Sequence, residues 1–170
     1  SSRGVVAHPG GVSWIATVID PGLNLPIGHE VMTLTGDGTL LKTGNVDSDC
    51  ELTSIAVVGE TCYFTAVCSG GTGFVGSVPL AGGTVQGLAG EWPAYAIGVD
   101  GTDMCWREHH PNSLARGGAL MRMDLAGGPN TGYGFNAGSV SQSLFSNIII
   151  RSHKGIADAW YTSQCSYNRY

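Results

Sequence analysis

Short runs of alternating hydrophobic and polar residues follow one another along the chain, and tight-turn residues separate them in pairs. The turn centres are Pro-Gly-Gly, Gly-Glu-Thr, Asp-Gly-Thr and His-Lys-Gly, which carry the chemistry of short hairpins. In each pair the second run contains an aromatic residue, so the four pairs align on Trp14, Tyr63, Trp106 and Trp160. The pattern predicts four β-hairpins, at residues 5–14, 55–63, 97–106 and 148–160.

A repeated phrase extends this pattern to further strands. Ser77–Gly83 returns forty-five residues later as Arg122–Gly128, and both copies end in Leu-Ala-Gly-Gly. A weaker copy, Val31–Gly38, lies forty-six residues before the first when Leu34 is aligned with Leu80. Each copy is expected to end a third strand, and a fourth strand is expected after it, at residues 39–44, 84–89 and 131–135.

Four antiparallel strands in each repeat of 40 to 50 residues are typical of a propeller blade. A β solenoid would show shorter periods of parallel coils, without a hairpin turn at every step. The predicted fold is therefore all-β and propeller-like, with about three and a half blades of four antiparallel strands. The predicted blades cover residues 4–48, 49–93 and 94–146, and the first two strands of a fourth cover 147–170.

The repeat unit resembles the extracellular β-propeller repeats of soil-dwelling bacteria. The shared features are an Asp-Gly-Thr turn, an aromatic strand, and a third strand that ends in Pro-Leu-Ala-Gly-Gly. The resemblance covers nearly the whole chain and is best in the two middle units. It implies a propeller fold in an exported protein, and it implies no particular activity, since such repeats often have none assigned.

Three and a half blades do not close a ring. Closed propellers have at least four blades, and an open arc exposes strand edges and apolar blade faces. We expect the arc to be completed by the remainder of a longer chain, by a second copy related by symmetry, or by a larger assembly. The expected partners are therefore further chain or another subunit, so the protein is expected to be oligomeric if it is not a piece of a larger one.

Composition agrees with one β-rich domain and excludes several classes of partner. The chain has 170 residues, of which 42% are hydrophobic, 12% are charged and 27 are Gly, a turn-dense composition that can still fill a core. Its formal net charge is −5, and its eight Lys and Arg residues are scattered, so a nucleic-acid partner is not expected. Its hydrophobic runs are too short to span a bilayer.

The cysteines suggest an oxidising compartment. Five Cys without a C-x-x-C pair, together with few Lys and many Thr, Ser and Gly residues, favour a secreted protein. In a propeller the loop before a blade's first strand and the loop after its second lie at the same end, which predicts a Cys50–Cys68 disulfide worth about 3 kcal/mol. Cys62 and Cys105 are expected to be buried thiols at the same blade position. Cys165 aligns with Cys68, and we expect its partner in further chain or in another subunit.

Two groups of residues at that same end are candidates for ligand binding. Glu108, His109 and His110 follow a second strand and could hold a divalent cation or supply a general base. Adjacent His side chains on an extended chain point in opposite directions, so an exposed polar loop is the alternative. Trp92 and Tyr95 could stack on a sugar or a peptide, or could pack between blades.

At the opposite end, His8, Asp100 and His153 lie near the first hairpin turns of their units and could converge on a metal ion near the channel. The alternative is that they are ordinary turn residues that hydrogen-bond to their own backbone.

Catalytic signatures such as Gly-x-Ser-x-Gly, His-Glu-x-x-His and the P-loop do not occur. The sequence therefore favours a non-catalytic extracellular propeller module that binds a partner or builds an assembly. The alternative is a metal-dependent propeller enzyme of the lactonase or lyase type, with a divalent cation at the central channel.

Overall fold

A computed structural model describes residues 3–43, 46–47, 49–99, 102–109, 119–126, 131–134, 147–153, 156–163 and 166–169. Within these ranges the regular structure is β, apart from one short 3-10 turn, η1 (Ser69–Gly71). The fold is thus all-β, as the sequence predicts. The described strands form four antiparallel sheets, each built from strands that are consecutive in the chain.

The first two sheets contain the N-terminal half of the chain. In the first, β1 to β4 pair in chain order and β5 pairs with β3. In the second, β6 to β9 pair in chain order. Their bounds are β1 (Arg3–His8), β2 (Gly11–Ile19), β3 (Pro26–Thr35), β4 (Leu40–Lys42), β5 (Val46–Asp47), β6 (Cys50–Val58), β7 (Thr61–Cys68), β8 (Thr72–Pro79) and β9 (Gln86–Ala89).

The third and fourth sheets repeat the same meander. The third contains β10 to β13 and the fourth β14 to β16, again paired in chain order. Their bounds are β10 (Ala94–Val99), β11 (Asp103–Glu108), β12 (Ala119–Asp124), β13 (Thr131–Gly134), β14 (Asn147–His153), β15 (Ile156–Ser163) and β16 (Ser166–Arg169).

The predicted hairpins and fourth strands are confirmed. The hairpins are β1–β2, β6–β7, β10–β11 and β14–β15, and the fourth strands are β4, β9 and β13. The prediction of only two strands in the last unit was wrong, because Ser163 pairs with Ser166 and the chain returns as β16. The short strand β5 was not expected either.

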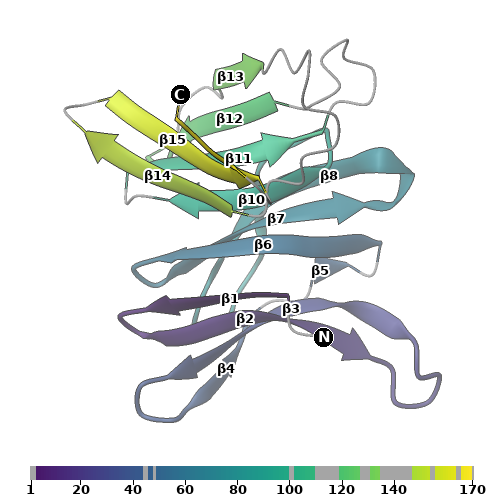
Figure 1. Ribbon diagram of the computed structural model, residues 1–170. Coiled ribbons are helices and arrows are strands. Elements are labelled where there is room, and N and C mark those ends of the chain that lie inside the picture. The colour runs from purple at the N-terminus through teal and green to yellow at the C-terminus, as the bar shows by residue number, and fades with distance from the viewer. Residues whose placement is uncertain are drawn as a thin grey trace.

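The sheets stack in chain order. The first strands contact one another in succession, β1 with β6, β6 with β10, and β10 with β14. In Figure 1 the first sheet lies at the bottom and the second above it, and the third and fourth sheets overlap at the top. One hydrophobic core joins the first and second sheets, with Ile15 and Val31 facing Leu52 and Phe64. A second core joins the second and third sheets, with Val75 facing Trp106.

Side-chain alternation corrects the aromatic alignment by one residue. Phe64 lies in the core shared with the first sheet, whereas its neighbour Tyr63 packs on the opposite face, toward the third sheet. Trp106 lies in the core shared with the preceding sheet, as Phe64 does. Ile15 faces the second sheet, so the adjacent Trp14 lies on the other face. Trp14, Phe64 and Trp106 are therefore the equivalent residues, and Tyr63 does not belong to the set.

The same argument separates two of the cysteines. Both Cys62 and Cys105 are buried, as predicted. However, Cys62 faces the first sheet with Phe64, whereas Cys105 packs with Ala96 on the face opposite Trp106. The prediction that they share one position was wrong.

The Leu-Ala-Gly-Gly turns hold the ends of the third strands to the first hairpin turns. Leu80 N donates to Glu60 O, and Leu125 N donates to Thr102 O, each at 2.8 Å. These equivalent bonds confirm the forty-five-residue repeat between the second and third sheets.

The first copy of the phrase was misaligned by two residues. Thr35 pairs with the first residue of β2, and Pro79 pairs with the first residue of β7. Leu34 therefore corresponds to Val78, forty-four residues later, and not to Leu80.

Candidate functional site

The predicted disulfide closes one end of the second sheet. Cys50 opens β6 and Cys68 ends β7, and the two residues are direct cross-strand partners. Their sulfur atoms are bonded, and their Cα atoms lie 3.9 Å apart. Just outside the bond, Ser69 N donates to Asp49 O at 2.8 Å. The prediction of this pair is confirmed, and it fixes the entry and exit of the first hairpin of this sheet.

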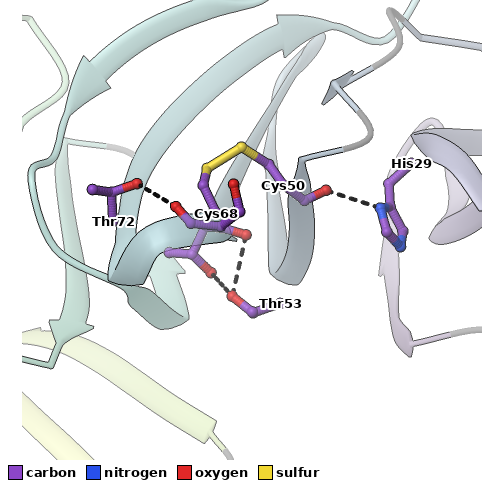
Figure 2. The surroundings of a disulfide bond; sticks show 7 residues. His29, Cys50, Thr53, Cys68 and Thr72 are labelled. Atoms are coloured by element: carbon purple, nitrogen blue, oxygen red, sulfur yellow. Dashed lines mark hydrogen bonds between the residues drawn. A yellow bond between two sulfur atoms is a disulfide. The ribbon is translucent and has the colours of Figure 1, made fainter.

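A histidine connects the disulfide to the first sheet. His29 Nδ1, on β3, lies 3.0 Å from the backbone carbonyl oxygen of Cys50, as Figure 2 shows. Because the acceptor is a carbonyl, Nδ1 carries the proton in this contact. No sequence pattern pointed to this role, because His29 lies within β3, twenty-one residues before Cys50.

A threonine on β6 connects the second sheet to the third. Thr53 Oγ1 donates to the backbone carbonyl of Ala94 at 2.8 Å and lies 2.8 Å from Thr65 Oγ1. Next to it, the hydroxyl of Ser54 accepts a hydrogen bond from Ile97 N at 3.3 Å. Thr53 lies at an irregularity in the pairing of β6 with β7, which lets a hydroxyl reach the neighbouring first strand.

The candidate ligand residues of the third sheet gather at the same end as the disulfide. Tyr95 pairs with Arg107, and Ala94 pairs with Glu108. His109 N donates to Pro93 O at 2.9 Å. Trp92, Tyr95, Glu108 and His109 are thus neighbours along the backbone, but Tyr95 packs on the face of Cys105 and Glu108 lies on the opposite face with Trp106. His110 lies outside the described residues.

Glu108 is not part of an exposed loop. It is the last residue of β11, and it is only 4% exposed. Its Oε1 accepts a hydrogen bond from the indole Nε1 of Trp106 at 2.9 Å. This carboxyl group therefore satisfies a buried indole, and the expectation of a solvent-facing Glu108 was wrong.

The guanidinium group of Arg107 packs over the ring of Tyr95. The guanidinium carbon of Arg107 lies 5.5 Å from the centre of the Tyr95 ring, within the range of a cation–π contact. Burial lowers the pKa of Arg107 from its ordinary value, and the charge interaction with Tyr95 opposes this change. Sequence reasoning missed Arg107, because an irregularity between Tyr95 and Ile97 shifts the register by one residue and brings Arg107 opposite Tyr95.

The backbone of Trp92 packs against the second sheet. A Cβ atom at Gly73 would lie 2.8 Å from the carbonyl oxygen of Trp92 and 2.7 Å from the Cα of Pro93. The half-buried Trp92 therefore belongs to a segment held closely between the second and third sheets. This is a backbone contact, so the packing of the Trp92 ring between sheets stays a prediction.

The imidazole of His8 is hydrogen-bonded within its own hairpin. Its Nδ1 accepts a hydrogen bond from Gly10 N at 3.2 Å, and its Nε2 lies 2.9 Å from Ser13 Oγ. Nε2 therefore carries the proton and donates to Ser13, whose hydroxyl lies 2.8 Å from that of the buried Thr33. Asp100 and the side chain of His153 lie outside the described residues, so their convergence with His8 stays a prediction.

The part of the chain that the structure describes has no group of three His, Cys, Asp or Glu side chains arranged to hold a metal ion. Nor does any helix in that part have the length and apolar character needed to cross a membrane.

The first sheet has an apolar outer face, defined here by Val5, Val12, Trp14, Leu34 and Leu40. Val12, Leu34 and Leu40 form one cross-strand row, and Val5 and Trp14 form the next. Val12 is 38% exposed, Leu34 44% and Leu40 52%. Within residues 4–109 and 121–126, among those whose side-chain exposure is described, all exposed large hydrophobic side chains lie in the first sheet or in its β2–β3 loop.

The equivalent faces of the next two sheets are buried. Val12 and Leu34 correspond to the pair Cys62 and Val78 in the second sheet and to Met104 and Met123 in the third. All four of these equivalents are buried. In the second and third sheets, the face that corresponds to the outer face is therefore covered by the preceding sheet.

Comparison with protein-family models and with curated proteins finds no match for this chain.

Proposed function

We propose that this chain is an arc of a β-propeller and acts as a non-catalytic extracellular module that binds a partner or builds an assembly. The observation that carries the proposal is the outer face of the first sheet, an apolar sheet face that remains open while its equivalents are buried. Apolar faces of this kind mark interaction surfaces in folded proteins.

The stacking of the sheets supports the propeller arrangement. Each sheet is a meander of consecutive strands, and the first strands lie beside one another in chain order. A two-sheet sandwich with Greek-key connections would instead exchange strands between its sheets. Meanders that pack face to face, with their first strands adjacent, have the arrangement of blades around a channel.

The disulfide supports an extracellular location. Bonds such as Cys50–Cys68 form and persist in oxidising compartments and are rare in the cytosol. The resemblance to exported bacterial repeats points in the same direction.

The candidate catalytic groups are already hydrogen-bonded within the protein, and this supports a binding or assembly role. Glu108 is buried against Trp106, and His8 is bonded to Ser13 and Gly10. Burial raises the pKa of the Cys62 thiol to about 12, so this thiol is protonated and a poor nucleophile at neutral pH.

Electron microscopy of the purified protein in its associated state, combined with activity assays, tests this proposal. We expect annular particles with a central channel, and no turnover of lactones or of uronate-type lyase substrates with added Ca²⁺, Mg²⁺ or Zn²⁺. Particles without a channel would contradict the propeller arrangement. Metal-dependent turnover would contradict the non-catalytic role.

A further inference from the structure

We infer that the β2–β3 loop docks on a zwitterionic lipid surface and inserts its aliphatic side chains among the acyl chains. The loop is taken here as residues 19–27, which include the last residue of β2 and the first two residues of β3. The inference goes beyond the proposed function, because it concerns neither the outer face nor the arrangement of the sheets.

The β2–β3 loop is longer than its counterpart in the second sheet. Val18 pairs with Gly28 at the end of the β2–β3 hairpin, and Cys68 pairs with Thr72 at the equivalent position of the β7–β8 hairpin. The short turn η1 joins the second of these pairs, whereas residues 19–27 join the first. The loop is thus an addition to the common repeat, and in Figure 1 it projects at the lower right, beyond the end of β2.

The added residues expose aliphatic side chains to solvent. Ile19, Leu23, Leu25 and Ile27 are between 42% and 69% exposed, and Leu23 is the most exposed of the four. Asp20 is the only charged residue of the loop. Aliphatic side chains gain free energy when they leave water, so the loop presents a small surface that favours an apolar environment.

Asp20 holds the backbone of the loop in one conformation. Its Oδ1 accepts hydrogen bonds from Gly22 N at 2.7 Å and from Leu23 N at 2.9 Å. Its own N donates to Leu25 O at 2.9 Å, and its carbonyl oxygen accepts from Asn24 N at 2.8 Å. The exposed leucines therefore stand on a fixed backbone, and less conformational entropy is lost when they bind.

The same hydrogen bonds lower the cost of taking the loop out of water. Pro21 has no backbone N–H group, and the N–H groups of residues 20 and 22–24 are all bonded within the loop. A backbone polar group without a partner is costly in hydrocarbon. Asp20 lies at the base of the loop, next to Ile19, which pairs with Pro26, so its charge stays at the level of the headgroups.

The types of side chain in the loop favour a lipid surface over a protein partner. The residues that dominate protein interfaces are enriched in Trp, Tyr and Arg, and Leu is under-represented among them. Residues 19–27 contain none of the three enriched types, and their exposed large side chains are Leu and Ile. A lipid surface needs no matching pocket, because binding scales with the apolar area that is buried.

The charge of the chain selects the kind of lipid. Residues 19–27 contain no Lys or Arg, and the formal net charge of the chain is −5. Basic residues are what attract a protein to anionic lipids, so a negatively charged membrane would repel this chain. The loop therefore fits zwitterionic headgroups such as phosphatidylcholine, and it enters the outer part of a bilayer without spanning it.

Flotation with phosphatidylcholine vesicles tests the inference. We expect the unmodified chain to float in a fraction that rises with lipid concentration, and to float less when phosphatidylglycerol is included. Leu23→Asp places a charge in the loop, and we expect it to lower the partition coefficient at least ~10-fold. Thr84→Asp is the control, because it adds the same charge at an exposed residue between β8 and β9, and it should float like the unmodified chain.

Further variants protect the test from a folding defect and from a contact elsewhere. Circular dichroism shows whether Leu23→Asp keeps its β structure, and Leu25→Asp replaces it if it does not. Leu40→Asp changes an exposed leucine of the outer face, and a loss of flotation equal to that of Leu23→Asp would overturn the inference. An unmodified chain that does not float would also overturn it, and so would stronger flotation with phosphatidylglycerol.

Light scattering coupled to size-exclusion chromatography separates lipid from a second copy of the chain. If the loop bound another copy, Leu23→Asp would lower the mass measured without lipid. We expect the unmodified chain and this variant to have the same mass, and a lower mass of the variant would overturn the inference. The proposed function fails by other observations, namely the lack of a channel or metal-dependent turnover, so the two failures can be told apart.

Discussion

The hydroxyl of Thr53 donates to the backbone carbonyl of Ala94 at 2.8 Å, which ties the first strand of the second sheet to the first strand of the third across forty-one residues of sequence. The same oxygen also contacts Thr65 Oγ1. This one side chain therefore holds two neighbouring first strands together.

Thr53→Val removes the hydroxyl and keeps the shape of the side chain. We expect the free energy of unfolding to fall by about 1–2 kcal/mol, because the polar groups that contact this hydroxyl lose a partner. Urea denaturation measures the change. Thr72→Val is the control, since the exposed Thr72 hydroxyl donates to Ser69 O of the adjacent η1 turn at 3.3 Å and does not link two sheets. Equal stability of the two variants would speak against a link between the sheets.

Gly76→Ala tests the packing of Phe64. A Cβ atom at Gly76 would lie 2.6 Å from Cζ of the Phe64 ring and 3.1 Å from the carbonyl oxygen of Gln86. Because Phe64 is fully buried, the ring has little room to move, and we expect a loss of about 1–3 kcal/mol in thermal or urea unfolding. Gly87→Ala, where a Cβ meets nothing within 4 Å, should change stability little. If both variants unfold alike, the tight contact with Phe64 is not present.

Reduction of Cys50–Cys68 tests the contribution of the disulfide. The bond closes a loop with a sequence separation of 18 residues, for which chain entropy gives a stabilisation of about 3 kcal/mol. We expect a reducing agent to lower the urea midpoint by a corresponding amount. In the double variant Cys50→Ser and Cys68→Ser the reducing agent should have no further effect, and a further drop there would mean that another bond is being reduced.

The Cys62 thiol makes stability depend on pH in the alkaline range. Burial raises its pKa from 9.0 to about 12, so the folded state holds this proton more tightly than the unfolded state does. Its contribution to stability is therefore complete below about pH 9 and is lost as the pH rises toward about 12.

Alkylation measured by mass spectrometry checks this environment. At pH 8 we expect iodoacetamide to modify Cys62 at least ~100-fold more slowly in the native protein than in urea, because the reagent attacks the thiolate. Cys62→Ala identifies the modified site. Similar rates in the native and unfolded protein would show that the thiol is accessible and ionised, contrary to the structure.

The strands that the sequence predicted are those with local turn chemistry. The Pro-Gly-Gly turn before β2 and the Leu-Ala-Gly-Gly turn after β8 fix hairpins whatever surrounds them. Between Ser163 and Ser166 the sequence contains neither Gly nor Pro. No local turn signal therefore predicted the last strand, β16.

The wrong predictions concern residues whose role depends on which face of their strand packs against another sheet. Tyr63 and Phe64 are adjacent aromatic residues, and only the packing between sheets decides which one corresponds to Trp106. For Glu108 a signal did exist. It lies two residues after Trp106 on the same face of β11, and a buried indole needs an acceptor.

The disulfide was predictable because both cysteines flank one hairpin, so that a single assumption about strand order brings them together. The contact of His29 with Cys50 was not, because it joins two sheets, and its partner is a backbone carbonyl that no sequence pattern marks.

The order of stacking also bears on how such a chain could have arisen. In the described part of the chain, the two larger hydrophobic clusters lie between sheets that are neighbours in sequence. A duplicated repeat inserted between two sheets would meet, on each side, the kind of face against which it already packs. The gene could therefore lengthen or shorten by whole repeats without the redesign of an existing core, and the number of sheets could change in evolution faster than the sheet itself.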